Sequence, residues 1–316
     1  MKISRIIMFI IIGLGLSLHA SSTRVTLKAA KSTSSYYQMA VQVGENINKK
    51  TNGKISVTIE ESQGSVQNVK EVKKRKGNYV FTTPPVLIKL ALLKKAMFKN
   101  DNPDAYKKIR SLFPIPFLTM HIVVRADSGI NSFADLAGKT LLIGKGSFGA
   151  KEAAKYMKLF GLKGKVKLIN AELSGAVAAL KNGQIDGFAT AGSYPAPNVI
   201  EAAASTKIKL LSMSDEQIKK TKRDKLIIPA GTYPGIDKNI VTTTLPVGVY
   251  TTTNMSNQTA YEITKAFWES KKNLEKQSVW WKAVTTKNLN MFNVKLHPGA
   301  LKYYNEIKVN IPAKIK

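Results

Sequence analysis

Apolar and polar positions alternate in a repeated order along the first hundred residues after the N-terminal region. Short segments with the apolar spacing of β-strands lie at residues 24–30, 54–62 and 79–83. Each leads through a polar turn into a segment with helical spacing, such as the one in which Met39, Val43 and Ile47 share a face. This repetition of strand, turn and helix predicts a mostly parallel sheet with helices on both faces.

Two longer apolar segments, at residues 117–129 and 239–253, interrupt this order. Each is long enough to cross from one part of a molecule to another, and the alternation of strand and helix starts again from Leu141. The sequence therefore predicts an α/β fold of two lobes joined by two crossover strands, the type II-like architecture of bilobed periplasmic binding proteins. The predicted lobes are residues 21–120 with 249–316, and residues 121–248.

The first twenty residues have the pattern of a secretory signal peptide. Lys2 and Arg5 give a positive start, residues 6–18 form a short apolar run, and the small Ala20 precedes a polar stretch. An uncleaved anchor is the alternative, but a spanning helix needs about 20 apolar residues. The chain has no cysteine, and so neither a disulfide nor a cysteine for lipid attachment. These features predict a soluble protein exported to a bacterial periplasm.

The chain is strongly basic, with 49 Lys and Arg residues against 20 Asp and Glu residues and a net charge of +29. Such a charge attracts anions. The lysines are scattered over polar helix faces and helix ends, and no RNA-recognition or zinc-finger pattern accompanies them. We therefore expect no nucleic-acid partner, and we attribute the lysine excess to an acidic partner surface or to a lysine-rich proteome.

The stretch 140–157 combines a strand, a glycine-rich turn and a helix. Gly144, Gly146 and Gly149 match the dinucleotide-binding pattern G-x-G-x-x-G, and the acidic Glu172 follows about twenty residues later. The motif lies in the middle of an exported chain, however, rather than in the opening unit of a cytosolic domain. We favour a turn that brings an anion to the amides of a helix N-terminus over a simple helix cap, and both over a dinucleotide site.

Polar turns follow several predicted strands, at the edge where open α/β sheets bind ligands. The candidate ligand-binding residues at these turns are Ser34, Ser35, Tyr36, Ser65, Asn68, Thr82, Thr83, Lys145, Ser147, Phe148 and Tyr194. A structural role is the open alternative for these positions. Ser34 or Ser35 can cap the first helix, Ser65 can cap the second, and Tyr194 can pack within its own turn.

The other reactive residue types do not form a catalytic pattern. His121 and His297 are far apart in the sequence, His297 is expected to start a helix, and no G-x-S-x-G motif is present. We therefore expect no enzymatic activity, no metal and no cofactor. Arg125 ends the first crossover strand, where it can clamp a carboxylate or, as we favour, pair with Asp127 or Asp135.

Several longer motifs resemble, in their order along the chain, those of the TAXI-type solute receptors of tripartite ATP-independent periplasmic (TRAP) transporters. These motifs are SSYYQMA, QGSVQNVKEV, HIVVRADSGINSFADLAGKTLLIGKGSFGA, GAVAALKNGQIDGFATAGSYPAP, IPAGTYPGID and HPGALKYY. They extend over nearly all of the chain after the predicted signal peptide. Two turns depart from the family pattern: the first is richer in hydroxyl groups, and Phe148 stands where the family has glycine.

The resemblance implies a two-lobed receptor that captures a small organic anion, glutamate-like or another carboxylate, and hands it to an inner-membrane TRAP permease. We expect a monomer that closes around its ligand. The alternatives are a receptor that senses a ligand for a membrane histidine kinase, and an exported enzyme on the same fold. Trp268, Trp280 and Trp281 are expected to pack the C-terminal helices, and a surface anchor for the permease is the less favoured interpretation of the adjacent pair.

Overall fold

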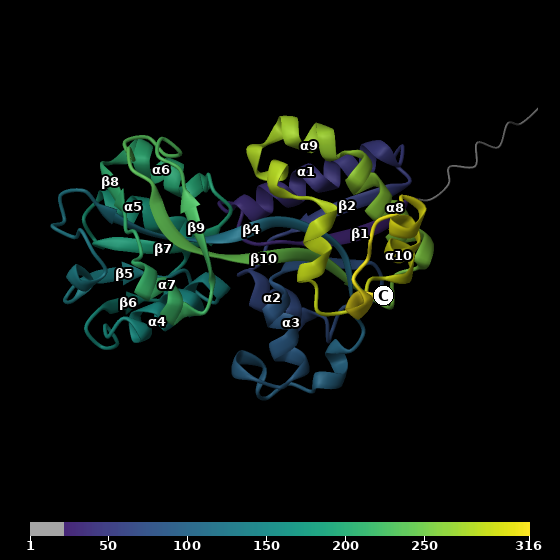
Figure 1. Cartoon of the computed structure of the whole chain (residues 1–316), viewed down its shortest axis with the longest axis horizontal. Coiled ribbons are helices and arrows are strands. Elements are labelled where there is room, and N and C mark those ends of the chain that lie inside the picture. Colours follow the sequence, from purple (N-terminus) through teal and green to yellow (C-terminus); the bar gives the residue numbers. More distant parts are fainter. Residues whose placement is uncertain (1–21) are drawn as a thin grey trace, which may run out of the picture.

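The computed structural model describes residues 22–316 (Figure 1), so the predicted signal peptide lies outside the described residues. The ten strands of this part of the chain form one sheet in the order β2-β1-β3-β10-β4-β7-β5-β6, with β8 beside β4 and β9 beside β10. The strands are β1 (Thr23–Lys28), β2 (Ile55–Glu60), β3 (Tyr79–Thr83), β4 (Ile109–Arg125), β5 (Thr140–Leu142), β6 (Lys167–Ile169), β7 (Gly187–Gly192), β8 (Ile208–Leu210), β9 (Asp224–Ile228) and β10 (Ile240–Thr252).

Helices pack around this sheet in two lobes (Figure 1). The helices are α1 (Ser35–Lys50), α2 (Ser65–Glu71), α3 (Pro85–Leu92), α4 (Phe148–Leu159), α5 (Ala176–Lys181), α6 (Pro197–Ser205), α7 (Asp215–Thr221), α8 (Asn257–Glu269), α9 (Lys271–Gln277) and α10 (Pro298–Glu306). The N-terminal lobe holds β1–β3, α1–α3 and α8–α10, and the central lobe holds β5–β9 and α4–α7. The predicted bilobed α/β fold is confirmed. Within residues 22–316, no helix has both the length and the apolar character that crossing a membrane requires.

Strands β4 and β10 run through both lobes and connect them. They pair antiparallel between Ile109–Thr119 and Thr244–Thr252. In addition, β10 pairs with β3 and β9, and β4 pairs with β7 and β8. The two predicted crossovers are therefore present. The first begins at Ile109, earlier than the pattern indicates, because two prolines in its first half weaken the sequence signal of a strand.

The sheet is less parallel than the sequence predicts. Parallel pairing holds within each lobe, where β1 lies between β2 and β3 and β5 lies between β6 and β7. Every pair that includes β4 or β10 is antiparallel. The predicted parallel pairing holds for β1–β3, the strands from which it is inferred, and the sheet as a whole is mixed because the crossover strands form the central ladders. The sequence pattern also does not predict β9, in which most residues are at least partly exposed.

Buried aromatic and aliphatic side chains form the core on both faces of the sheet. The larger cluster runs from the N-terminal lobe into the central lobe, and in it the rings of Phe113 and Phe267 stack with their centroids 3.9 Å apart. A second cluster lies around Phe188 in the central lobe. The buried Glu152 accepts two hydrogen bonds of 2.8 Å from Arg223, so its charge is paired inside the central lobe.

His121 connects β4 to two loops of the central lobe. Its Nδ1 lies 3.2 Å from the carbonyl oxygen of Thr119 and therefore donates to it, which leaves Nε2 to accept from the Tyr233 hydroxyl at 2.8 Å. The same hydroxyl accepts from the backbone amide of Ala196 at 2.9 Å. Burial lowers the pKa of His121 to about 4. The imidazole is therefore neutral at pH 7, as this hydrogen-bond chain requires.

This chain of hydrogen bonds makes stability depend on pH above the range where carboxyl groups titrate. Between about pH 6.5 and pH 4 the unfolded chain binds a proton at His121 and the folded protein does not, so the free energy of unfolding falls as the pH falls. We expect a loss of up to about 1.4 kcal/mol per pH unit from this group. Burial also lowers the pKa of His297, which adds to the slope.

Urea unfolding at pH 7, 6.5, 6 and 5.5 measures this slope above the range where carboxyl groups titrate. The variant His121→Gln should flatten it in part, and the double variant with His297→Gln should flatten it almost completely. Every carboxyl group with a shifted pKa in residues 22–316 is shifted downward, so these groups contribute mainly below about pH 5 and little to a slope measured above that pH. An unchanged slope in the double variant would contradict the assignment.

Candidate functional site

A cavity of about 70 Å³ lies between the two lobes, at the ends of several strands. Its walls come from the turns that lead into α1, α2 and α4, from β4 and β7, and from the segment after β6. The predicted site residues that line it are Ser34, Tyr36, Ser65, Lys145, Ser147 and Phe148. The fold thus brings together candidates from three separate turns, two in the N-terminal lobe and one in the central lobe.

The N-terminus of α1 forms one wall of this cavity. Ser34 caps the helix, as predicted, because its Oγ accepts from the backbone amide of Tyr37 at 3.3 Å. The hydroxyl of Tyr36 donates to the carbonyl oxygen of Pro116 at 3.1 Å, and burial raises the pKa of this hydroxyl far above its usual value. Tyr36 therefore lines the cavity with its hydroxyl engaged on β4. The amides of Tyr37 and Gln38 donate to Ser34, so the backbone amides of Ser35 and Tyr36 are those that the helix N-terminus leaves for a ligand.

The glycine-rich turn before α4 forms the opposite wall. Gly144 and Gly146 adopt left-handed φ angles of 43° and 70°, which residues with a Cβ rarely take. Ser147 caps α4: its Oγ accepts from the amide of Ala150 and donates to the carbonyl oxygen of Gly144, each at 2.9 Å. A Cβ on Gly149 would lie 2.7 Å from the Cβ of Ala191, so this glycine allows α4 to approach β7.

These glycines therefore serve a tight turn and close helix packing. The hydroxyl of Ser147 is already used in the cap, so the anion-binding groups that the turn can offer are backbone amides and Lys145.

The N-terminus of α2 differs from the prediction. Gly64, and not Ser65, is the N-cap residue, and the cap has no side-chain hydrogen bond. The serine that precedes the turn takes part instead, because the Oγ of Ser62 accepts from the amide of Gly64 at 2.9 Å. Ser65 is the first residue of the helix and lines the cavity, so its hydroxyl is not committed to a cap. The prediction that Ser65 caps α2 is therefore wrong.

Glu172, which lies in the central lobe after β6, interacts with a charged side chain and an amide side chain from the other wall of the cavity. One carboxylate oxygen of Glu172 lies 3.4 Å from Nζ of Lys31, and the other accepts from Nε2 of Gln63 at 3.2 Å. Both partners belong to the N-terminal lobe, so Glu172 bridges the lobes. The Glu172 side chain is 45% exposed and that of Lys31 is 31% exposed, so water screens the pair.

Several predicted site residues lie outside this cavity. These residues are Ser35, Asn68, Thr82, Thr83 and Tyr194. The amide of Asn68 donates to three carbonyl oxygens of the neighbouring strand ends, at Lys28, Ala29 and Thr82, and thereby fixes α2 against β1 and β3. The two threonines are buried within the end of β3.

Ser35 has a structural role between the lobes. Its Oγ accepts from the backbone amide of Ser193, just after β7, at 2.9 Å. The hydroxyl of Ser193 in turn donates to the carbonyl oxygen of Phe117 at 2.7 Å. A Cβ on Gly192 would lie 2.8 Å from the Oγ of Ser35, so the glycine permits this approach. Ser35 thus joins the start of α1 to the end of β7. Tyr194 lies in the following turn and lines a separate groove.

Some residues of the cavity are not among the predicted candidates. The main ones are Lys31, Gln63, Leu118, Glu172, Leu173 and Thr190. Lys31 and Gln63 lie shortly before the candidates Ser34 and Ser65. A search that includes the residues just before each turn therefore identifies them. Leu118 and Leu173 are apolar, so nothing in the sequence marks them as site residues. Only the folded positions of β4 and of the segment after β6 place them in the cavity.

Two other sequence predictions can be compared with the structure. Arg125 pairs with Asp127 through hydrogen bonds of 2.9 and 2.6 Å, which confirms the favoured pairing. His297 caps α10, as predicted, and accepts from the amide of Gly299 at 3.2 Å. Within residues 22–316, no cluster of three or more His, Asp or Glu side chains is arranged to hold a metal ion.

The bilobed fold with a cavity between the lobes is the fold of periplasmic binding proteins. The chain belongs to the NMT1-like family, which matches residues 27–307.

Solved structures share this fold at low sequence identity. The periplasmic binding protein BugD is 11% identical, covers 92% of this chain and 99% of its own, and gives a TM-score of 0.58. MatC from Rhodopseudomonas palustris, solved with bound malate, is 11% identical with a TM-score of 0.57 and coverages of 90% and 97%. A protein from Bordetella bronchiseptica RB50 is 16% identical with a TM-score of 0.52 and coverages of 91% and 99%.

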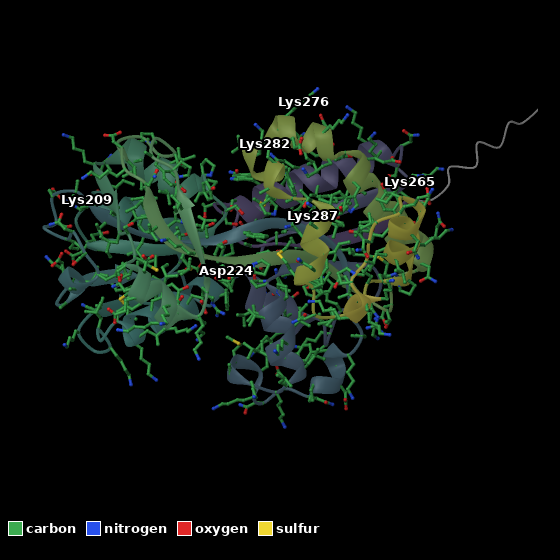
Figure 2. The ribbon with its side chains drawn as sticks, in the orientation of Figure 1. Lys209, Asp224, Lys265, Lys276, Lys282 and Lys287 are labelled. Atoms are coloured by element: carbon green, nitrogen blue, oxygen red, sulfur yellow. The ribbon has the colours of Figure 1, made fainter. Side chains whose placement is uncertain are left out.

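The bridge at Glu172 gives a prediction about the distance between the lobes. Glu172→Gln removes the attraction to Lys31, so we expect the ratio of closed to open protein to fall by up to about fivefold, since an exposed ion pair contributes at most about 1 kcal/mol. The distance distribution between spin labels measures this ratio. The chain has no native cysteine, so Lys209→Cys and Lys276→Cys, on different lobes in Figure 2, give specific labels.

Asp127→Asn is the matched control. It breaks an ion pair that lies within the central lobe, between Asp127 and Arg125. The distances between the labels should not change in this variant. Equal effects of Asp127→Asn and Glu172→Gln would show that general charge, and not the bridge between the lobes, sets the distance.

Proposed function

We propose that the protein is a periplasmic receptor that captures a small organic anion between its lobes and delivers it to an inner-membrane permease. The observation that carries this proposal is the meeting of the N-termini of α1 and α4, from opposite lobes, at one cavity. The free amides and the dipole at each helix N-terminus favour an anion. Lys145 adds a positive side chain to the same cavity, and Lys31 adds a second, which is paired with Glu172.

A carboxylate suits this arrangement better than a larger anion. Its two oxygens can accept from amides of both helix N-termini when the lobes are closed. The apolar side chains of Leu118, Phe148 and Leu173 line the cavity and favour a ligand with a short carbon skeleton. The volume of about 70 Å³ suits a small headgroup, and a glutamate-like ligand would need the lobes slightly farther apart.

The assignment to a particular type of receptor follows the sequence motifs that resemble TAXI-type receptors. We propose a TAXI-type receptor of a TRAP transporter, which works as a monomer in the periplasm after loss of residues 1–20. We further propose that residues 21–120 with 249–316 and residues 121–248 close as two bodies around the ligand. Membership of the NMT1-like family and the binding-protein fold support a receptor rather than an enzyme. No observation favours the alternative of sensing for a histidine kinase.

Native mass spectrometry of gently purified mature protein tests this proposal directly. We expect the native mass to exceed the denatured mass by the mass of a small carboxylic acid. A bare protein that also shows no thermal shift with a panel of carboxylates, amino acids and sulfonates would refute the proposal. Turnover of any of these compounds would favour the enzyme alternative instead.

Substitution of a cavity lysine tests the location of the site. Lys145→Gln should weaken the binding of the identified carboxylate by about tenfold, because a charge-assisted contact contributes about 1.5 kcal/mol or more. Lys151→Gln, on an exposed position of α4, has the same charge change and should leave affinity within about twofold. Isothermal titration measures both. Equal losses in the two variants would mean that net charge, and not the cavity, attracts the ligand.

A further inference from the structure

The exposed Val279 and the half-buried Trp280 form an apolar ridge at the boundary between the lobes. They lie in the short 3-10 helix Val279–Ala283, after α9. Val279 is 58% exposed, the highest value among the large exposed hydrophobic residues of the described chain. The next residue, Trp281, is fully buried and donates from its indole nitrogen to the side chain of Gln42 at 2.7 Å. The ridge therefore has a rigid attachment to the N-terminal lobe.

A groove lies on each side of this ridge, and each groove has walls from both lobes. The first, of about 430 Å³, is lined by the ridge and by Pro195, Pro197 and Ile200 of the central lobe. The second, of about 250 Å³, is lined by the ridge, by Tyr194 of the same lobe and by residues of β4 and β9. Ile200 is itself 42% exposed. Both grooves are of a size that accepts apolar side chains.

One hydrogen bond links the ridge to the central lobe. The indole nitrogen of Trp280 donates to the carbonyl oxygen of Pro195 at 3.0 Å. The bond joins the C-terminal part of the N-terminal lobe to the turn after β7, and so holds the walls of both grooves together in the described arrangement of the lobes.

The surface around the ridge is positively charged. Lys272, Lys276, Lys282 and Lys287 are exposed, and none of them takes part in an ion pair within residues 22–316. Figure 2 shows Lys276 and Lys282 projecting from the lobe that carries α9. In the same stretch, Glu275 is paired with Lys271, so its charge is already balanced. The exposed Glu201 lies on the far wall of the first groove.

We propose that the Val279–Trp280 ridge and its two grooves are a docking surface for an acidic protein segment that carries apolar side chains. This inference rests on the proposed function, because it assigns the surface to a periplasmic loop of the permease that receives the ligand. Apolar side chains of the loop enter the grooves, and carboxylates of the loop meet the unpaired lysines. Because Trp280 and Pro195 come from different lobes, the loop contacts both lobes at once.

A peptide assay tests the chemistry of this surface and does not require the permease itself. The probe is a fluorescein-labelled peptide with a Leu-Phe pair between two pairs of glutamates, and the readout is fluorescence anisotropy with the whole mature protein. We expect the peptide to bind, and the peptide with glutamines in place of the glutamates to bind at least about tenfold more weakly. Added salt should weaken the acidic peptide selectively.

Variants locate the binding. Val279→Ser removes an exposed side chain, and Lys276→Gln with Lys282→Gln removes two charges beside it, so each change should weaken the peptide by about tenfold with little effect on folding. The matched control is Lys209→Gln with Lys238→Gln, which removes two charges from the opposite side of the central lobe and should leave the affinity unchanged. Trp280→Phe keeps the ring and loses the bond to Pro195, and we expect an intermediate loss.

Three outcomes would overturn the proposal. The first is absence of peptide binding, and the second is an equal loss in the control double variant, which would indicate diffuse charge. The third is binding of phosphatidylglycerol vesicles that depends on these residues while the peptide does not bind, which would assign the surface to a membrane. Ligand retention in native mass spectrometry should be unchanged in Val279→Ser, so failure of this inference is distinguishable from failure of the proposed function.

Discussion

The antiparallel pairing of β4 with β10 is the constraint on which the rest of the molecule depends. These two strands cross between the lobes in opposite directions and share a ladder from Ile109–Thr119 to Thr244–Thr252. Backbone groups buried at the lobe boundary must find hydrogen-bond partners, and this ladder supplies them without a folded linker domain. The result is one sheet that both lobes share. The lobes can therefore change their angle only by bending two strands, which limits the directions of closure.

The same constraint places the helix N-termini at the cavity. In each lobe, parallel strands end at the side that faces the other lobe, and the helices that follow β1 and β5 begin there. Gly149 and Gly192 let α4 and α1 approach β7 more closely than a side chain would permit. Two helix dipoles with their positive ends toward one space would repel each other in the absence of negative charge. Glu172 supplies a carboxylate at the edge of that space, and an anionic ligand would supply another.

The sequence predicts the fold better than it predicts the site, for physical reasons that particular residues show. Strand and helix spacing depends on burial along one element, so both crossovers and the short strands other than the largely exposed β9 follow from the pattern of apolar residues. The roles of neighbouring hydroxyl groups do not follow. Ser34 and Ser35 are adjacent and chemically identical, yet one caps α1 and the other accepts from Ser193 in the opposite lobe. Asn68 has the character of a ligand-binding residue, but three strand-end carbonyls occupy its amide. Such outcomes depend on contacts between distant segments, which a local pattern does not contain.

If the lobes close around an anion, as proposed, the contacts between them bear on how the ligand would control closure. The bonds that the protein itself makes across the boundary are the amide of Ser193 to Ser35, the bridge of Glu172 to Lys31 and Gln63, and the indole of Trp280 to Pro195. Each exchanges with water when the lobes separate, so each contributes only about 1 kcal/mol to closure. Their sum is opposed by the repulsion between the helix dipoles. An anion that accepts from both helix N-termini makes its full set of contacts in the closed state alone, and a preference of about 1.4 kcal/mol for that state already shifts the populations tenfold. If the open and closed arrangements have nearly equal free energies without a ligand, binding of a small anion is enough to make the closed arrangement the main one.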